Sequence, residues 1–252
     1  MKKFICITVL TSALLTTIFS NAKIPNILRG KVTIHRDQDY SDFFEAIERG
    51  LNANATLEDR SYFERAQNII TLVCRNFKLD HIPSTIKNLS SLTDLILEDT
   101  LLSSFPEQIT ELHSLRCLDL QNNQIKELPD SIGDLNNLQQ LKLKNNHISS
   151  LPESLTNLKK LFLIDLSNNW FNYFPTILDS LPNLQVVLLA GNEIEKIPPE
   201  LFKDSTIIWQ LDMSNNPLER PPIKIGRLKL YSEAPKIWLG EPTTALISPG
   251  TF

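Results

Sequence analysis

The sequence predicts a solenoid of the α/β class, in which stacked copies of one repeat build a parallel sheet of short strands. The first observation is a fixed period of 23 residues, marked by leucine or isoleucine at position 1 of successive copies: Ile69, Leu92, Leu115, Leu138, Leu161 and Leu184. The second is that positions 4 to 6 of a copy alternate apolar and polar residues, which is the periodicity of a strand. A period of this length indicates a solenoid, because one repeat cannot bury its apolar edge without a neighbour.

The clearest copy is LRCLDLQNNQIKELPDSIGDLNN, residues 115–137. Leu118 and Leu120 point to one side of the predicted strand, and Asp119 points to the other. The chain then turns, which leaves backbone groups that need hydrogen-bond partners. An asparagine at position 9 can supply them because its amide both donates and accepts, and five copies have it: Asn123, Asn146, Asn169, Asn192 and Asn216. A proline at position 15, such as Pro129, suits the start of a short helical turn.

The pattern L-x-x-L-x-L-x-x-N-x-I-x-x-L-P-x-x-I-x-x-L resembles the 23-residue, Ras-suppressor-like subtype of bacterial leucine-rich repeat (LRR) proteins, and it covers roughly two thirds of the chain. The resemblance implies a right-handed LRR solenoid with a concave parallel β-sheet and short helical or 3-10 turns on the convex side. It also implies that the position-9 asparagines lie inside and bond the backbone of adjacent turns. About seven copies occupy residues 69–228, and no cofactor is implied.

The repeat is irregular at both ends. Position 9 is Phe77 in the first copy and Thr100 in the second, so we expect the ladder of asparagines to begin at Asn123. The sixth copy has 24 residues, and the extra residue is expected within residues 203–206. Residues 229–252 lack the repeat pattern and are predicted to form a C-terminal cap and a tail.

Residues 1–22 have the features of a secretory signal. Lys2 and Lys3 form a positive start, an apolar stretch follows, and Ser20 and Ala22 are small residues at the two sites that a signal peptidase reads. We therefore expect cleavage after Ala22 and a secreted or periplasmic mature protein without a transmembrane segment. The alternative is an uncleaved anchor, but the apolar run is short for a bilayer span of about 20 residues.

Residues 23–68 are predicted to form an N-terminal helical cap. Apolar residues spaced four apart indicate a helix over residues 41–51. Thr56 and Asp59 have the spacing of a capping box, which predicts a second helix ending at Ala66. Two such helices would cover the exposed apolar edge of the first repeat.

The same segment contains an alternative signal for calcium. Acidic and hydroxyl residues occur at positions 1, 3, 5, 9 and 12 of an EF-hand loop: Asp37, Asp39, Ser41, Glu45 and Glu48. Position 6 of such a loop should be glycine for its sharp turn, and here it is Asp42. We favour an acidic helix start, which the helix dipole stabilises, and we expect no metal site.

The cysteines do not predict a disulfide or an active site. Cys74 is at position 6 of its copy and faces the predicted core, whereas Cys117 is at position 3 and faces outward, two strands away. Cys117 is the one candidate nucleophile, but no histidine base falls beside it in the register. Sequence motifs of known catalytic sites are also absent. The sequence therefore indicates a protein that is not an enzyme.

The outward strand positions suggest a binding site in the fifth and sixth copies. Most of these positions are polar, but Leu163, Val186 and Leu188 form an apolar island, and Trp170 is predicted near its rim. Apolar residues beside an aromatic one and ringed by polar groups are typical of an interface hot spot. The alternatives are that such apolar residues are ordinary surface residues and that Trp170 packs on a neighbouring turn. The polar residues predicted to contribute are Gln140, Lys142, Asp165 and Asp119, with Asp212 nearby.

These features predict a secreted module that binds a protein partner on its concave face. With 25 basic and 29 acidic residues and no basic stripe, the chain is not expected to bind nucleic acid. The sequence leaves open whether a bacterial protein of this kind is directed at a host or stays in the envelope. Two rival classes are a structural envelope component and an enzyme subunit that uses Cys117. The sequence does not indicate the partner's identity or the oligomeric state.

Overall fold

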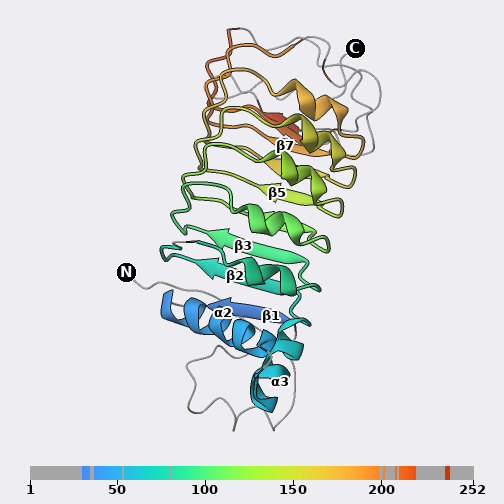
Figure 1. The fold of residues 1–252 in the computed structure, drawn as a ribbon. Helices are drawn as coiled ribbons and strands as arrows, with labels where there is room; N and C mark the ends of the chain where they lie inside the picture. Colours follow the sequence, from blue (N-terminus) through green and yellow to red (C-terminus); the bar gives the residue numbers. More distant parts are fainter. Residues whose placement is uncertain are drawn as a thin grey trace. The chain divides into compact units, whose positions relative to one another are not determined.

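The structure, a computed structural model, describes residues 30–34, 37–52, 54–79, 81–198, 201, 208, 210–219 and 236–238. The chain forms two compact units, one of residues 1–102 and 106–123 and the other of residues 103–105 and 124–252. Each unit is a stack of repeats built on parallel strands (Figure 1). The predicted signal, its cleavage site, the extra residue of the sixth copy and most of the predicted C-terminal cap lie outside the described residues.

The first unit contains four parallel strands that pair in chain order. Their bounds are β1 Lys31–Ile34, β2 Thr71–Arg75, β3 Asp94–Glu98 and β4 Cys117–Asp119. Two 3-10 turns follow β2 and β3: η1 Ser84–Asn88 and η2 Glu107–Glu111. From β2 onward the register joins equal positions of successive copies, as in the pair Asp94 and Cys117. The predicted strands are therefore confirmed, although β4 covers positions 3 to 5 of its copy and not positions 4 to 6.

The second unit repeats this plan. Its strands are β5 Gln140–Lys142, β6 Leu163–Asp165, β7 Val186–Leu188, β8 Gln210–Asp212 and β9 Lys236–Trp238, each parallel to the next. Its 3-10 turns are η3 Asp130–Asp134, η4 Glu153–Asn157 and η5 Thr176–Ser180. The repeated prolines Pro129, Pro152 and Pro175 lie at the N-cap, one residue before each turn, with φ near −72°. Proline suits this place because its ring already fixes φ close to that value.

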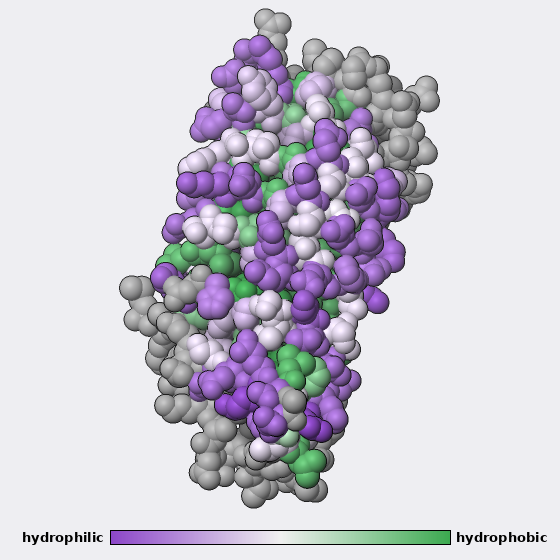
Figure 2. Space-filling view, in the orientation of Figure 1, coloured by the Kyte–Doolittle hydropathy of each residue, from purple (hydrophilic) through white to green (hydrophobic). Residues whose placement is uncertain are grey.

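The core of each unit is made of the repeated leucines and isoleucines. In the fourth copy Leu141, Leu143, Ile148, Leu155 and Leu158 are all fully buried. Burying one such side chain stabilises the fold by about 1.5–3 kcal/mol. On the face of the molecule shown in Figure 2, hydrophilic side chains predominate and hydrophobic ones occur in small patches. The alternation read from the sequence thus separates an apolar interior from a polar surface.

Two helices form the predicted N-terminal cap of the first unit. Helix α2 spans Asp37–Leu51, so it begins four residues before the predicted start, and α3 spans Leu57–Ala66. The capping box is confirmed: Thr56 Oγ1 accepts a hydrogen bond from Asp59 N at 3.1 Å, and Thr56 N donates to Asp59 Oδ2 at 3.1 Å. These bonds from Thr56 favour the ionised carboxylate and lower the pKa of Asp59.

The structure rejects the disfavoured alternative for this region and corrects one prediction. The calcium alternative is wrong, because Asp37 to Leu51 form one continuous helix and not a loop. In addition, β1 was not predicted: residues 31–34 lie within the region expected to be helical, but they pair in parallel with β2. No helix in the described segments is long and apolar enough to cross a bilayer.

Replacing Gly50 with alanine is expected to lower the free energy of unfolding of the first unit by about 1–3 kcal/mol. A Cβ at Gly50 would lie 2.5 Å from Phe63 Cβ and 2.7 Å from Asp59 O, so α2 and α3 would have to separate. The contact outweighs the gain of about 1 kcal/mol that alanine usually brings to a helix. Urea unfolding followed by circular dichroism measures the change. Glu48→Ala, at an exposed position of α2, is the matched control, and an equal effect of both changes would contradict the packing argument.

Candidate functional site

The outward side chains of β5 to β8 form two rows across the second unit. Pairing places position 3 of each copy side by side, which gives the row Gln140, Leu163, Val186 and Gln210. Position 5 gives the parallel row Lys142, Asp165, Leu188 and Asp212. Neighbouring members of a row are about 4.8 Å apart, the usual distance between strands. The structure therefore brings together seven of the residues that the sequence assigned to the island and its rim.

Leu163, Val186 and Leu188 are half-buried, unlike the fully buried core residues Ile164 and Val187 on the opposite side of the same strands. We call these three the apolar strand patch. Gln140 and Gln210 lie at the two ends of the position-3 row, on either side of Leu163 and Val186, and Gln210 is exposed. The patch is thus a small apolar surface on a rigid sheet with amide groups on both sides.

The aspartates at position 5 bond mainly to their own turns. Asp165 is only 8% exposed, and its Oδ1 accepts a hydrogen bond from Ser167 N at 3.0 Å. Asp212 Oδ1 accepts from Ser214 N at 3.0 Å in the same way. These carboxylates therefore close the bend that follows each strand, a structural role that the sequence interpretation missed. Gln140, half-buried, and Gln210, exposed, are the uncharged polar side chains beside the patch.

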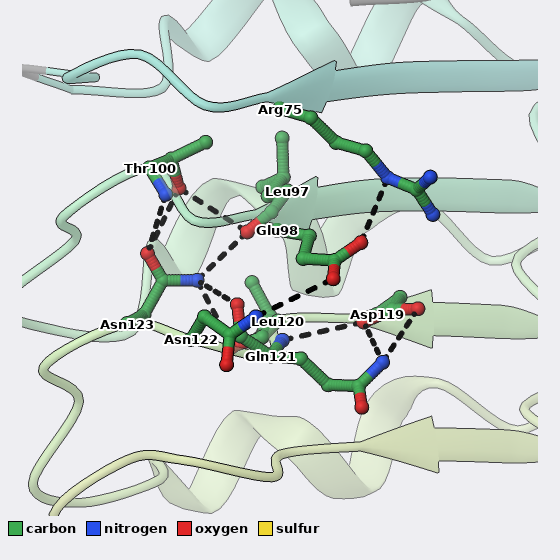
Figure 3. A network of polar contacts seen from close by, with 9 residues as sticks. All are labelled: Arg75, Leu97, Glu98, Thr100, Asp119, Leu120, Gln121, Asn122 and Asn123. Atoms are coloured by element: carbon green, nitrogen blue, oxygen red, sulfur yellow. Dashed lines mark hydrogen bonds and ion pairs between the residues drawn. The ribbon is translucent and has the colours of Figure 1, made fainter. Parts of the chain in front are cut away.

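Asp119 belongs to the first unit and has the same local role. It is 2% exposed, and its carboxylate accepts bonds from Gln121 N at 3.2 Å and from Gln121 Nε2 at 3.0 and 3.1 Å (Figure 3). A carboxylate held in this way has little surface to offer to a partner. Its predicted part in binding stays a prediction, and we base no proposal on it.

The position-9 asparagines form the predicted ladder. In the first unit, Asn123 Nδ2 donates to Leu97 O at 2.7 Å and to Leu120 O at 2.9 Å (Figure 3). Its Oδ1 accepts from Leu102 N at 3.0 Å. The Thr100 hydroxyl also donates to this Oδ1, at 2.9 Å, so threonine continues the ladder by one copy. In the second unit Asn146, Asn169, Asn192 and Asn216 repeat the pattern. The ladder orders the turns that follow the strands.

The residue before each ladder position has a left-handed backbone. At position 8 of all seven copies φ lies between 52° and 67°: Asn76, Asp99, Asn122, Asn145, Asn168, Gly191 and Asn215. Asparagine, aspartate and glycine tolerate this conformation better than other residues do. The repeated Asn-Asn pair in the sequence was a sign of this left-handed position, but only its second asparagine, the ladder residue, was used in the prediction.

Trp170 lies in the turn after β6 and packs on the preceding copy. Its ring stacks on His147 with centroids 4.3 Å apart and planes at 25°, and Trp170 N donates to Ile148 O at 2.9 Å. The alternative that this tryptophan packs on a neighbouring turn is therefore confirmed. Even so, 54% of its surface remains exposed. We assign it to the turns and not to the apolar strand patch.

The two cysteines of the described chain do not form a reaction centre. Cys74 is buried in the core as predicted, and burial raises the pKa of its thiol, which disfavours the reactive thiolate. Cys117 is half-buried, and its register neighbour on β3 is Asp94. The pair Val73 and Ile96 share a register, but Val73 is buried. In the part of the chain that the structure describes, no three histidine, cysteine or acidic side chains could hold a metal ion.

Known proteins resemble this chain in both sequence and fold. Residues 105–204 match the model of the leucine-rich repeat region family. The structure is similar to an LRR protein of Leptospira interrogans, with 26% identity, a TM-score of 0.55, and coverage of 63% of this chain and 45% of that one. It is also similar to internalin C2 of Listeria monocytogenes, with 26% identity, a TM-score of 0.52, and coverage of 65% and 68%. The match spans less than half of the Leptospira protein, and no curated protein sequence matches.

Proposed function

Because this chain is a leucine-rich repeat protein similar to bacterial ones, we propose that it is an interaction module that binds a protein partner through the outward face of β5 to β8. The observation that carries the proposal is the apolar strand patch, three neighbouring aliphatic side chains with Gln140 and Gln210 on either side. A hydrophobic centre with a polar rim is the usual anatomy of a protein interface. A patch fixed by a sheet also loses little conformational entropy when a partner binds.

We further propose that the mature protein acts outside the cytoplasm of a bacterium. The signal-like features of residues 1–22 support this localisation, and the similarity to Leptospira and Listeria proteins supports a bacterial source. Binding without catalysis is the favoured activity, since the buried Cys74 is unsuited to act as a nucleophile and Cys117 has an aspartate as its register neighbour on β3. The identity of the partner is left to experiment.

Replacing Leu188 with aspartate is expected to weaken capture of the partner by about tenfold or more, because a charge would be desolvated in the centre of the interface. Stability should change little, since Leu188 is only half-buried. Crosslinking and pull-down from the cell envelope and culture medium identify the partner. Titration with the purified partner then measures its affinity for the wild-type protein and for Leu188→Asp.

Ile70→Asp is the matched control, because Ile70 is an aliphatic residue with accessible surface, 46% exposed, that lies outside the patch. This control should capture the partner as the wild-type protein does. Undiminished capture by Leu188→Asp would mean that the partner binds elsewhere.

A further inference from the structure

The turns of the second unit form a groove that shares no residue with the apolar strand patch. Its volume is about 640 Å³, and it is lined by residues at positions 12 to 16 of three successive copies, beyond the strands. Phe174, Ile197 and Pro198 supply apolar surface, and Tyr173, Glu195 and Glu219 supply polar and aromatic groups. We call it the turn groove. Its volume falls within the range of about 300–1,000 Å³ that is usual for ligand sites.

One aromatic ring of the turn groove, that of Tyr173, is exposed to solvent. Tyr173 is 77% exposed, although its neighbour Phe174 is buried and anchors the same turn. Tyr173 and Trp170 are the two aromatic residues among the large exposed hydrophobic residues that the described chain contains, and they are three residues apart. Tyrosine in this situation offers a wide apolar face together with a hydroxyl group, a combination that is enriched at interfaces.

The charges around this ring are mainly negative. Glu193, Glu195 and Glu219 are exposed on the two copies that follow Tyr173. Among the described residues, Lys196 is the basic one that lines the groove, and its Nζ lies 3.3 Å from Glu219 Oε1. That ion pair compensates one carboxylate and leaves the groove with an excess of negative charge. An aromatic face beside carboxylates is complementary to a planar cation, which can stack on the ring and donate hydrogen bonds to a carboxylate.

We propose that the turn groove binds an arginine side chain in a segment of a partner protein. The guanidinium group would stack on the ring of Tyr173 and donate hydrogen bonds to the carboxylate of Glu195, while the flanking apolar residues pack on Phe174, Ile197 and Pro198. Arginine fits better than lysine because its flat fork can stack and form two hydrogen bonds to one carboxylate at the same time. This site does not depend on the apolar strand patch.

The test uses the whole mature chain and three fluorescein-labelled peptides of the sequence Gly-Ser-Xaa-Pro-Xaa-Ser-Gly, with arginine, lysine or citrulline at Xaa. Fluorescence anisotropy should show saturable binding of the arginine peptide, weaker binding of the lysine peptide and none of the uncharged citrulline peptide. Tyr173→Ala and Glu195→Gln should each weaken binding of the arginine peptide by about tenfold. Asn172→Ala, an exposed residue of the same turn, should leave it unchanged.

Three results would overturn the proposal. They are no binding of the arginine peptide, equal binding of the citrulline peptide, and equal binding by the Tyr173→Ala protein. Binding of a neutral oligosaccharide such as maltohexaose, without binding of the arginine peptide, would also overturn it by showing a carbohydrate site. Circular dichroism of each variant confirms that the fold is retained, as expected for exposed positions.

Discussion

Replacing Asn169 with alanine is expected to lower the free energy of unfolding of the second unit by about 3–5 kcal/mol. Its Oδ1 accepts from Ile148 N at 2.9 Å, and its Nδ2 donates to Leu143 O at 2.9 Å and Leu166 O at 3.1 Å. Alanine would leave Ile148 N without this partner, which costs about 1–3 kcal/mol. It would also remove one of the two ladder amides that donate to Leu143 O and to Leu166 O, at about 0.5–1.5 kcal/mol each, while Asn146 and Asn192 remain bonded to these carbonyls. Urea unfolding monitored by far-ultraviolet circular dichroism gives the free energy.

Two further variants distinguish the effect of losing these hydrogen bonds from the effect of removing any asparagine side chain. Asn172→Ala removes an exposed asparagine from the same copy and should change the free energy of unfolding by less than about 0.5 kcal/mol. Asn169→Asp keeps the acceptor for Ile148 N but loses both donors, so it should also be strongly destabilising, because its charge is buried. If Asn169→Ala were no less stable than Asn172→Ala, the ladder would not be a source of stability.

The sequence was most informative where the chain repeats itself. The strand positions and the buried leucines were predicted because the same residue type recurs every 23 residues, which averages out local exceptions. The ladder could be predicted for a physical reason as well, since a buried turn needs partners and asparagine can supply both donor and acceptor. Even its start was predictable, since Phe77 has no polar side-chain atom to replace the amide.

Features that occur once, or that depend on side-chain contacts, were not predictable. Strand β1 is a four-residue segment outside the repeat, and its pairing with β2 is a long-range contact without a local signal. Asp165 looked like a surface charge because its position faces outward, but its carboxylate bonds to its own turn. Trp170 looked like part of the strand site because only its position was known, and not its stacking on His147.

The two candidate surfaces differ in how far the sequence revealed them. Strand register alone placed Leu163, Val186 and Leu188 together, so the apolar strand patch followed from counting residues. The turn groove was missed because it combines side chains of three copies, and its charged members and Tyr173 stand at positions 12 and 13, where residue types vary from copy to copy. The one local sign was Tyr173, an aromatic residue at a position that is serine or charged in the neighbouring copies.

Replacing Phe171 with alanine is expected to lower the free energy of unfolding of the second unit by about 3–5 kcal/mol, the usual cost of removing a buried aromatic ring. Phe171 is 1% exposed and occupies position 11, where other copies of this unit have Ile125, Ile148 and Ile194 and the seventh copy has Leu218. Differential scanning calorimetry should show a lower transition temperature for the variant.

Phe171→Ile should cost less than the alanine change, because the turn already accepts isoleucine at this position in three neighbouring copies and a smaller cavity remains. Tyr173→Ala is the matched aromatic control: it lies two residues later in the same turn, is exposed, and should leave the transition nearly unchanged. An equal loss in Tyr173→Ala would mean that Tyr173 is held by packing, so its ring would not be available to a partner. It would also mean that Phe171 is not the residue that anchors this turn.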